Sequence, residues 1–367
     1  MCFVKKKGVV IFMQLFVQTE VKNRGWEAVA FDLLDVPFIP TADNISLTAF
    51  LGNKSVNRKV RTITPIDNGY HIVIDPIYYN GDFKLELHDH SHVMSFSKAD
   101  VDLDHIRVKD LDLFEAKREG DVIYRLYHPK AHGPRPLLLF LHGGGECGSD
   151  NILQMTGTLG ALKLAKMYPD LYVMAPQAPG SIEEMLPDPS IVFKNTFHTT
   201  SIMPGFGWHR EYIAKVCDVI RGMIADGKVN PDKVFVTGLS MGGCGTLRAL
   251  SVAGDLFAAA APICPTMMPD TYQILSSLVD TKLWVSTAYA DHTIYRHKYI
   301  VDAIMKLKDS GNKNAHLTLY SPEEMERYGF ADPKLPLLEK LSENHNAWVL
   351  TYNNEYGIMD WLVSQHK

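Results

Sequence analysis

The sequence predicts a two-domain protein in which a large α/β domain, a mostly parallel sheet with helices on both faces, follows a small antiparallel β-sandwich. Up to about residue 108, short apolar alternations are separated by turn residues and show no helical period. From about residue 109 onward, apolar strands alternate with helical patterns. We therefore place the domains at 1–108 and 109–367, a division that suits a chain of 367 residues.

The composition excludes several classes of protein. With 46% hydrophobic and 22% charged residues, the chain resembles ordinary globular proteins rather than disordered or fibrous ones. Lysine and arginine number 37 against 42 aspartates and glutamates, which gives a net charge of −5. This balance offers no basic surface for a phosphate backbone or an anionic membrane. We expect neither a nucleic acid nor a membrane as partner.

The cysteines and the amino terminus bear on localisation. Five widely spaced cysteines without a C-x-x-C pair predict neither a disulfide framework nor a zinc site, which favours a reducing, cytoplasmic location. Secretion is the alternative, because three lysines at 5–7 precede an apolar run at 8–16 as in a signal peptide. No small-residue cleavage site follows, however, and the run is too short to span a membrane. A further interpretation takes Met13 as the start, residues 1–12 as an upstream extension and 14–21 as the first strand.

The amino-terminal domain is expected to consist of short strands joined by tight turns. The clearest alternations lie at 28–33, 60–63, 70–74 and 83–87. Turn-forming residues at 53–54, 67–69 and 80–82 bound them. This spacing is typical of a small antiparallel sandwich.

The second domain contains buried strands that alternate with helices. Predicted strands lie at 122–127, 137–141, 171–175, 234–237, 258–263, 282–287 and 316–320. Predicted helices lie at 161–167, 211–225, 243–253, 297–309 and 347–365. Functional residues of such sheets gather beyond the carboxyl ends of the strands. Candidate residues are therefore sought directly after strands.

Ser240 is the predicted nucleophile. The strand at 234–237 runs into Gly238-Leu239-Ser240-Met241-Gly242 and then into a helix, which is the G-x-S-x-G pattern in its strand-turn-helix context. The tight turn requires glycine at the flanking positions and exposes the serine hydroxyl at the edge of the sheet. A glycine-rich turn with an incidental serine is the competing interpretation, and the context argues against it.

Asp291 is the predicted orienting acid. A serine hydroxyl needs a histidine to accept its proton, and that histidine needs an anion to hold its tautomer. Both are expected after the serine in the chain, at later strand ends. Asp291 lies four residues beyond the strand at 282–287, whereas Asp280 precedes that strand and lies at the wrong edge of the sheet. A turn or capping role for Asp291 is the alternative.

His345 is the predicted general base. It follows the last predicted strand and precedes the final predicted helix. Each of the other histidines beyond Asp291 is less suitable. His292 adjoins the acid and His297 falls on a predicted helix, whereas His316 opens a strand and His366 lies at the end of the chain. A surface histidine is the competing interpretation, but exclusion of the others favours His345.

The glycines after the strand at 137–141 predict an oxyanion hole. The sequence there is His142-Gly143-Gly144-Gly145-Glu146, the type of loop that supplies a backbone donor. We assign the donors to the backbone N–H groups of Met241 and Gly144, with Gly145 as the alternative. A phosphate loop is disfavoured because the G-K-[ST] ending is absent and the following glutamate would repel phosphate.

Glu146 has two interpretations and is not assigned to chemistry. It forms a structural hydrogen bond to the loop at 205–210, or it lies solvated at the surface.

Long insertions at 180–209 and 321–344 are candidate pocket or lid segments. Their aromatic residues stack on a substrate or pack a small local core: Phe193, Phe197, Phe206 and Trp208.

Together these residues resemble the α/β-hydrolase superfamily, and within it the esterases related to polyhydroxybutyrate depolymerases and the prolyl-oligopeptidase-like esterases. The resemblance rests on four stretches, at 141–151, 175–177, 238–243 and 345–362. It implies the same triad of Ser240, Asp291 and His345, and an immunoglobulin-like fold for the first domain. In one departure, Thr287-Ala288 stands where the family usually ends the strand before the acid with a His-Gly pair.

These observations predict a serine carboxylesterase that hydrolyses short-chain acyl esters through an acyl-enzyme, without a metal or organic cofactor. Its expected partner is a small-molecule or carbohydrate-linked ester, with acyl or feruloyl groups of plant polysaccharides as candidates. The first domain binds carbohydrate or only supports the catalytic face. Two alternatives are a prolyl-oligopeptidase-like peptidase, although the chain has no propeller-sized segment, and a non-catalytic binding protein on a hydrolase scaffold. Oligomeric state stays open.

Overall fold

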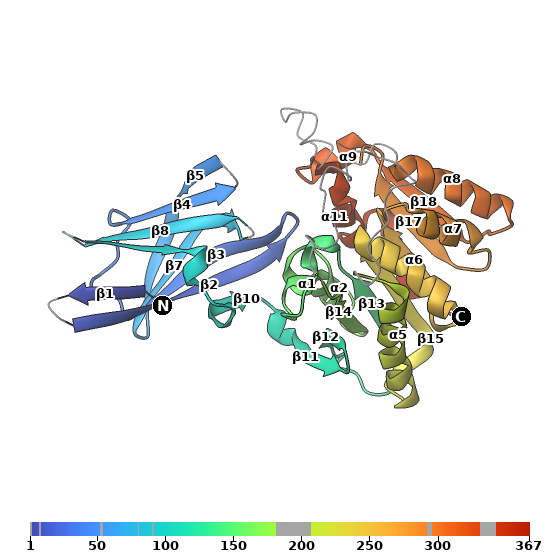
Figure 1. Cartoon of the computed structure of the whole chain (residues 1–367), viewed down its shortest axis with the longest axis horizontal. Coiled ribbons are helices and arrows are strands. Elements are labelled where there is room, and N and C mark those ends of the chain that lie inside the picture. The colour runs from blue at the N-terminus through green and yellow to red at the C-terminus, as the bar shows by residue number, and fades with distance from the viewer. Residues whose placement is uncertain are drawn as a thin grey trace. The chain divides into compact units, whose positions relative to one another are not determined.

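The structure is a computed structural model. It describes residues 2–6, 9–51, 54–79, 81–89, 92–180, 207–291, 296–330 and 343–367. The chain forms two compact units (Figure 1). Unit 1 comprises Met1–Asp112 with Thr156–Thr158, and unit 2 comprises Leu113–Met155 with Leu159–Lys367. Among the described residues, no helix has the length and apolar character needed to cross a membrane.

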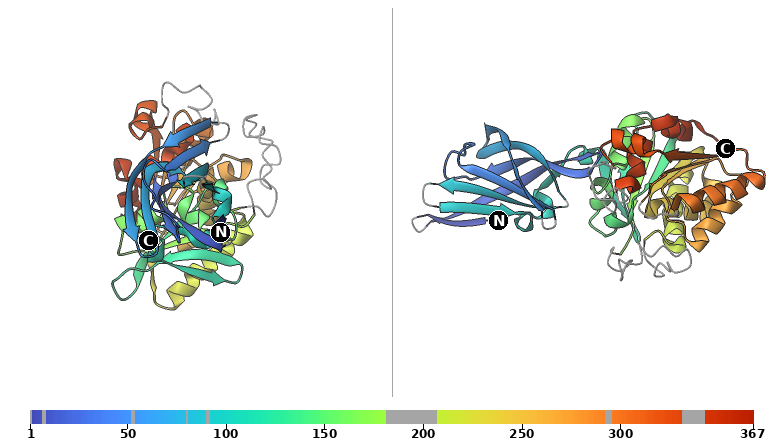
Figure 2. Two further views of the ribbon diagram at one scale, coloured as in Figure 1. Left: turned by 90° about the vertical axis from the view of Figure 1, so that its left-hand side faces the viewer. Right: turned by 90° about the horizontal axis from the view of Figure 1, so that it is seen from above.

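Unit 1 consists of two sheets whose pairs are antiparallel, apart from one short parallel strand at an edge (Figure 2). The first sheet has the order β1-β2-β3-β7-β6, and β10 pairs with β2 in parallel. Its strands are β1 (Cys2–Lys6), β2 (Val9–Lys22), β3 (Gly25–Leu34), β7 (Gly69–Tyr78), β6 (Val60–Ile66) and β10 (Ile106–Val108). The second sheet has the order β5-β4-β8-β9. Its strands are β5 (Lys54–Arg58), β4 (Ile45–Leu51), β8 (Asp82–Asp89) and β9 (His92–Ser97).

Alternating apolar residues from both sheets fill the core of unit 1. Phe31 of β3 packs against Phe83 of β8, with ring centroids 5.2 Å apart. Leu47 and Leu85 are buried beside them on the second sheet. Short 3₁₀ helices complete the unit, namely η1 (Lys98–Asp100), η2 (Leu103–His105) and η3 (Leu111–Leu113), the last of which runs into unit 2. The predicted β-sandwich is thus present.

The first long strand begins earlier than the sequence predicts. The first predicted strand, at 14–21, begins earlier, at Val9, and pairs with β1 in an antiparallel hairpin. The described residues among 1–12 lie in these two strands. Met13, Leu15 and Val17 are buried on one face, so the alternation already includes the residue before Gln14.

Unit 2 is built on an eight-stranded sheet of order β11-β12-β14-β13-β15-β16-β17-β18. The first three strands pair antiparallel, and the pairs from β14 to β18 are parallel. The strands are β11 (Phe114–Glu119), β12 (Val122–Tyr127), β13 (Arg135–Leu141), β14 (Tyr172–Gln177), β15 (Val229–Leu239), β16 (Ala259–Ile263), β17 (Leu283–Ala288) and β18 (Ala315–Tyr320).

Helices connect these strands (Figure 1). The α-helices are α1 (Leu153–Thr156), α2 (Ala161–Met167), α5 (Arg210–Ala225), α6 (Met241–Ala253), α7 (Pro269–Ser277), α8 (Arg296–Asp309), α9 (Pro322–Arg327), α11 (Ala347–Tyr352) and α12 (Ile358–Ser364). The 3₁₀ helices are η4 (Gly144–Glu146), η5 (Gly254–Leu256), η6 (Asn344–Asn346) and η7 (Glu355–Gly357).

Strand β13 shows how both faces of the sheet are covered. Leu137, Leu139 and Leu141 share a buried cluster with the apolar residues of α5. Phe140 points the other way and packs against Tyr352 of α11, with ring centroids 5.8 Å apart. A strand buried on both faces is continuously apolar, which explains the run of leucines in the sequence.

The final helix predicted at 347–365 is broken in the structure. It forms α11 and α12, separated by η7. Asn354, Tyr356 and Gly357 all have positive φ, at 65°, 57° and 67°. Because an α-helix cannot continue through left-handed residues, the chain turns here and presents two short helices to the sheet. The single-helix prediction was therefore wrong.

Candidate active site

Ser240 lies at the sharp turn between β15 and α6. Its backbone has φ 56° and ψ −114°, a conformation that non-glycine residues rarely adopt and that costs about 1–3 kcal/mol. Two backbone hydrogen bonds hold it there: the Ser240 N–H donates to the Ile263 carbonyl at 2.9 Å, and the Cys244 N–H donates to the Ser240 carbonyl at 3.1 Å. Strain of this kind clusters at functional sites.

The flanking glycines are required by close backbone contacts. A Cβ atom at Gly238 would lie 2.3 Å from the Gly242 carbonyl oxygen. A Cβ atom at Gly242 would lie 1.9 Å from the Leu141 carbonyl oxygen and 2.6 Å from that of His142. The glycine requirement that the G-x-S-x-G pattern predicts is confirmed, and the start of α6 packs directly on the end of β13 and the loop that follows it.

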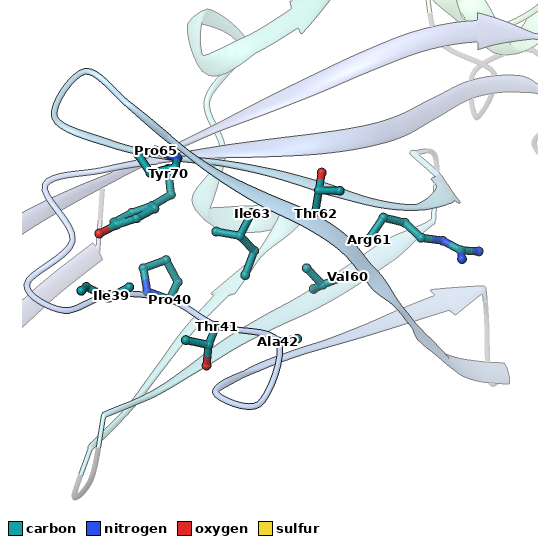
Figure 3. A pocket seen from close by; sticks show the side chains of 10 residues that line it. All are labelled: Ile39, Pro40, Thr41, Ala42, Val60, Arg61, Thr62, Ile63, Pro65 and Tyr70. Atoms are coloured by element: carbon teal, nitrogen blue, oxygen red, sulfur yellow. The ribbon is translucent and has the colours of Figure 1, made fainter.

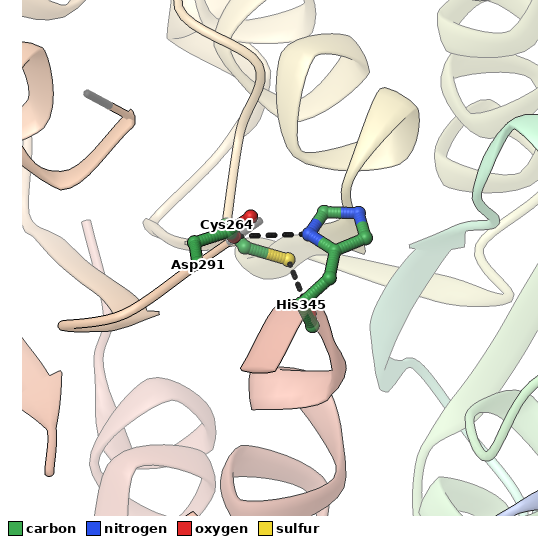
Figure 4. A group of neighbouring side chains, drawn as sticks. All are labelled: Cys264, Asp291 and His345. Carbon is green, nitrogen blue, oxygen red and sulfur yellow. Dashed lines mark hydrogen bonds and ion pairs between the residues drawn. The ribbon is translucent and has the colours of Figure 1, made fainter. Parts of the chain in front are cut away.

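Ser240, His345 and Asp291 form one hydrogen-bonded row. His345 Nε2 lies 2.9 Å from Ser240 Oγ, and His345 Nδ1 lies 2.9 Å from Asp291 Oδ2. The Asp291 side chain is buried, and that of His345 is 17% exposed. The structure thus brings the three predicted residues together, and Figure 4 shows the histidine and aspartate side chains facing each other.

Each member of the row follows a different element at the same edge of the sheet. Ser240 follows β15, Asp291 follows β17 by three residues, and His345 lies on η6 just before α11. The Trp348 ring and the imidazole pack edge to face, with centroids 5.3 Å apart. On α11, the Thr351 hydroxyl lies 2.8 Å from that of Ser286 on β17. This contact holds α11, and with it His345, against the sheet.

The predicted oxyanion loop forms η4 at the end of β13. Gly144 and Gly145 lie in this 3₁₀ turn, and Met241 is the first residue of α6. The amides of a first helical turn have no intrahelical acceptor, so the Met241 N–H points out of the helix. The two segments are in contact through Gly242 and Leu141. The predicted donors therefore come from two segments that pack on each other beside Ser240.

His142 fixes the position of this loop, a role that the sequence did not reveal. The side chain is fully buried, its Nδ1 bonds the Gly143 carbonyl at 2.7 Å, and its Nε2 accepts the Ala178 N–H at 2.8 Å. The proton therefore sits on Nδ1. Burial lowers the pKa of His142 to about 4, because the charged form is poorly solvated. It is neutral at pH 7.

Trp208 and Gln177 complete the support of the loop. The indole N–H of Trp208 donates to the His142 carbonyl at 2.9 Å, and the ring packs against Gly245 of α6. Gln177 donates to the Glu146 carbonyl at 3.2 Å and accepts the Asn151 N–H at 2.7 Å. These contacts explain why residues far from Ser240 in sequence are part of the site.

The structure excludes one of the two interpretations of Glu146. Its side chain is only 5% exposed, so the solvated surface role is wrong. A carboxylate oxygen lies 3.9 Å from His142 Nδ1 and would lie 3.0 Å from a Cβ atom at Gly143. Glu146 therefore packs inside the loop that it follows.

Other predicted substrate contacts lie outside the described residues. These are the aromatic lid candidates Phe193, Phe197 and Phe206, and residues 331–342 of the second insertion at 321–344 are likewise undescribed. Trp208 is described, and its ring is buried in the core. This finding favours the packing role for Trp208.

Unit 1 has a hollow of about 350 Å³ (Figure 3). It is lined by the connection from β3 to β4 and by β6, together with Tyr70 of β7. Arg61, its charged lining residue, is paired with Asp75 at 2.5 Å. Ser240, Asp291 and His345 do not line this hollow.

Comparisons with known proteins bear on the fold and the family. Residues 208–322 match the model of the prolyl oligopeptidase family. A thermostable esterase structure matches with a TM-score of 0.64 and 21% identity, covering 96% of this chain and 99% of that chain. The acylaminoacyl peptidase of Pyrococcus horikoshii matches with a TM-score of 0.45 and 12% identity, covering 100% and 56%. A search of curated proteins gave no match.

The chain has an α/β-hydrolase fold preceded by a β-sandwich, as the sequence predicted. The family match over 208–322 includes Ser240 and Asp291, and the resemblance to the prolyl-oligopeptidase-like group is confirmed. These findings support a serine hydrolase, with ester and peptide substrates equally compatible.

Proposed function

We propose that this protein is a serine carboxylesterase that hydrolyses short-chain acyl esters through an acyl-enzyme. The observation that carries the proposal is the hydrogen-bonded row of Ser240, His345 and Asp291 at the carboxyl ends of the strands. The glycine loop beside it would supply the oxyanion donors. The solved structure that shares the fold over 96% of this chain is described as an esterase, which makes ester cleavage the first activity to test.

The geometry suits two successive acyl transfers. His345 Nε2 accepts the Ser240 proton as the hydroxyl oxygen attacks the ester carbonyl, and the protonated ring then gives that proton to the leaving alcohol. Asp291 holds Nδ1–H and stabilises the imidazolium. The backbone donors of Met241 and Gly144 or Gly145 would bind the oxyanion. Water then repeats the attack on the acyl-serine and releases the acid.

The natural ester is part of the proposal. We include acyl and feruloyl esters of plant polysaccharides among the substrates, with the β-sandwich unit as a carbohydrate-binding or supporting domain. Arabinoxylan carrying acetyl or feruloyl groups would test this directly. Release of acid from the polymer by the full chain, but not by a variant lacking residues 1–108 that still cleaves small esters, would give unit 1 a role in substrate binding.

A serine peptidase is the second candidate, because the family match is to the prolyl oligopeptidases. The same row of residues can cleave an amide. Paired substrates with one acyl group, a p-nitrophenyl ester and the matching anilide, separate the two activities. An ester-to-anilide rate ratio that exceeds the ratio of the two uncatalysed reactions supports the esterase. Preferred cleavage of the anilide, or of proline-containing peptides, would show that the protein is a peptidase instead.

The decisive variant is Ser240→Ala, assayed on p-nitrophenyl esters from acetate to decanoate. Its kcat is expected to fall by roughly 10⁴ to 10⁶-fold, because the nucleophile is lost. Ser251→Ala, an exposed serine on the same helix, is the matched control and should retain full activity. Absence of turnover in the folded wild-type protein on all esters and amides would favour a binding protein on a hydrolase scaffold.

A further inference from the structure

We propose that Cys264, Asp291 and His345 form an inhibitory site for a thiophilic divalent cation such as Zn²⁺. The three side chains offer a thiol, a carboxylate and an imidazole, and one ligand atom from each lies within 4.8 Å of the others. Figure 4 shows the thiol beside the histidine and aspartate. The inhibition rests on the proposed function, whereas the binding does not.

The position of Cys264 follows from the fold. Cys264 comes directly after β16, the strand between those that lead to Ser240 and Asp291. Its φ is 35°, an uncommon value for a residue with a side chain, and its N–H donates to the Ser286 carbonyl at 2.7 Å. The Cys264 thiol also contacts the His345 carbonyl at 3.5 Å. The thiol therefore lies beside the His345 backbone, and its sulfur is within 4.8 Å of the imidazole and carboxylate ligand atoms.

The three ligand atoms lie close enough to be drawn around one tetrahedral ion, with the widest separation within 4.8 Å. Zinc binds sulfur at about 2.3 Å and nitrogen or carboxylate oxygen at about 2.0–2.2 Å, which sets ligand atoms about 3.5 Å apart. His345 Nδ1 and Asp291 Oδ2 are now 2.9 Å apart, because a proton lies between them. Replacing that proton by the ion requires these two atoms to separate by about 0.5 Å. Thiolate, imidazole and carboxylate together select zinc-like ions over magnesium or calcium.

Binding would switch His345 to the wrong tautomer. The ion takes the Nδ1 lone pair, and the Nδ1 proton moves to Nε2, so Nε2 can no longer accept the Ser240 proton. The Cys264 thiol becomes a thiolate and releases its proton to water. One proton is therefore released per bound ion, and two negative ligands balance the divalent charge. Binding should tighten as the pH rises.

The binding is tested without activity. The Ser240→Ala protein is titrated with Cd²⁺, and the ultraviolet charge-transfer absorption of a cadmium–thiolate bond is recorded. We expect the absorption to saturate at one ion per chain. It should disappear when Cys264→Ala or Cys264→Ser is added, and persist with Cys217→Ala, a matched change at a buried cysteine on α5. The two Cys264 variants cover the case in which one of them fails to fold. Persistence of the absorption in a folded Cys264 variant, or no absorption in Ser240→Ala, would overturn the site.

The inhibition is tested on the active enzyme. Each variant is assayed with Zn²⁺ against its own metal-free rate on a p-nitrophenyl ester. Removing the thiol should raise the half-inhibiting concentration by at least about tenfold, because a ligand is lost. Cys217→Ala should match the wild type. Equal inhibition of the Cys264 variants would show that zinc acts elsewhere. If the wild type hydrolysed no ester, the proposed function would fail while the cadmium titration still decided the site.

Discussion

At the scale of single residues, the two buried side chains of Asp291 and His142 have distinct roles. Asp291 orients the histidine that serves Ser240, whereas His142 holds the oxyanion loop and bonds none of the three. The two roles require different charge states of the side chains. The aspartate must be ionised to stabilise an imidazolium, and the buried histidine must be neutral to accept a backbone N–H.

Asp291→Asn is expected to lower kcat by about 10⁴-fold, because an amide can stabilise the wrong histidine tautomer. The matched control is Asp280→Asn, an exposed aspartate that precedes β17 at the opposite end of that strand. Its activity should equal that of the wild type. Steady-state rates on p-nitrophenyl butyrate measure both, and equal rates for the two variants would remove Asp291 from the mechanism.

The lowered pKa of His142 predicts that the free energy of unfolding depends on pH. Its pKa is near 4 in the folded protein and near 6.5 in the unfolded chain, so the unfolded state binds more protons between these values. The neutral ring therefore supports folding fully above pH 6.5. This support declines as the pH falls toward 4, by about 3 kcal/mol in total.

His142→Gln isolates this effect, because glutamine can accept the Ala178 N–H but cannot ionise. The free energy of unfolding, measured in urea from pH 7 to pH 4, should fall more steeply for the wild type than for the variant. Parallel curves would mean that His142 does not titrate as described.

At the scale of elements, the packing of α6 on the loop after β13 creates the site. Gly242→Ala would place a Cβ atom 1.9 Å from the Leu141 carbonyl oxygen, so the helix start must move away from the oxyanion loop. We expect loss of most activity together with destabilisation by several kcal/mol, on the order of the cost of overpacking a core.

The matched change is Gly222→Ala on α5, where a Cβ atom meets no described atom within 4 Å. Alanine favours a helix over glycine, so this variant should keep its activity and gain about 0.5–1 kcal/mol. Thermal unfolding and ester turnover measure both variants. A fully active Gly242→Ala protein would show that the close approach is not needed.

The elements also show what could be predicted from sequence. The central strands and the row Ser240, Asp291 and His345 were predictable, because buried strands are continuously apolar and function gathers at their carboxyl ends. The positioning roles of His142 and Trp208 were not, since they depend on contacts between segments distant in sequence. Strand β5 was missed because all five of its residues are exposed and show no alternation.

At the scale of the whole molecule, each unit has its own buried core, so destabilising one core should leave the other able to fold. Phe31→Ala removes a fully buried ring from unit 1 and should cost about 3–5 kcal/mol there. The temperature at which ester turnover is lost should stay that of the wild type, whereas Leu139→Ala in unit 2 should lower it. Calorimetry with parallel activity assays tests this. Equal losses of turnover in the two variants would contradict separate folding.

The proposed mechanism requires that Ser240 is a nucleophile activated by His345. The most direct measurement is reaction with a fluorophosphonate, which captures an activated serine, followed by mass spectrometry of the digested protein. We expect one adduct per chain on the peptide that contains Ser240, no adduct in Ser240→Ala, and much slower labelling in His345→Ala. An adduct on another residue, or an unchanged rate without His345, would contradict it.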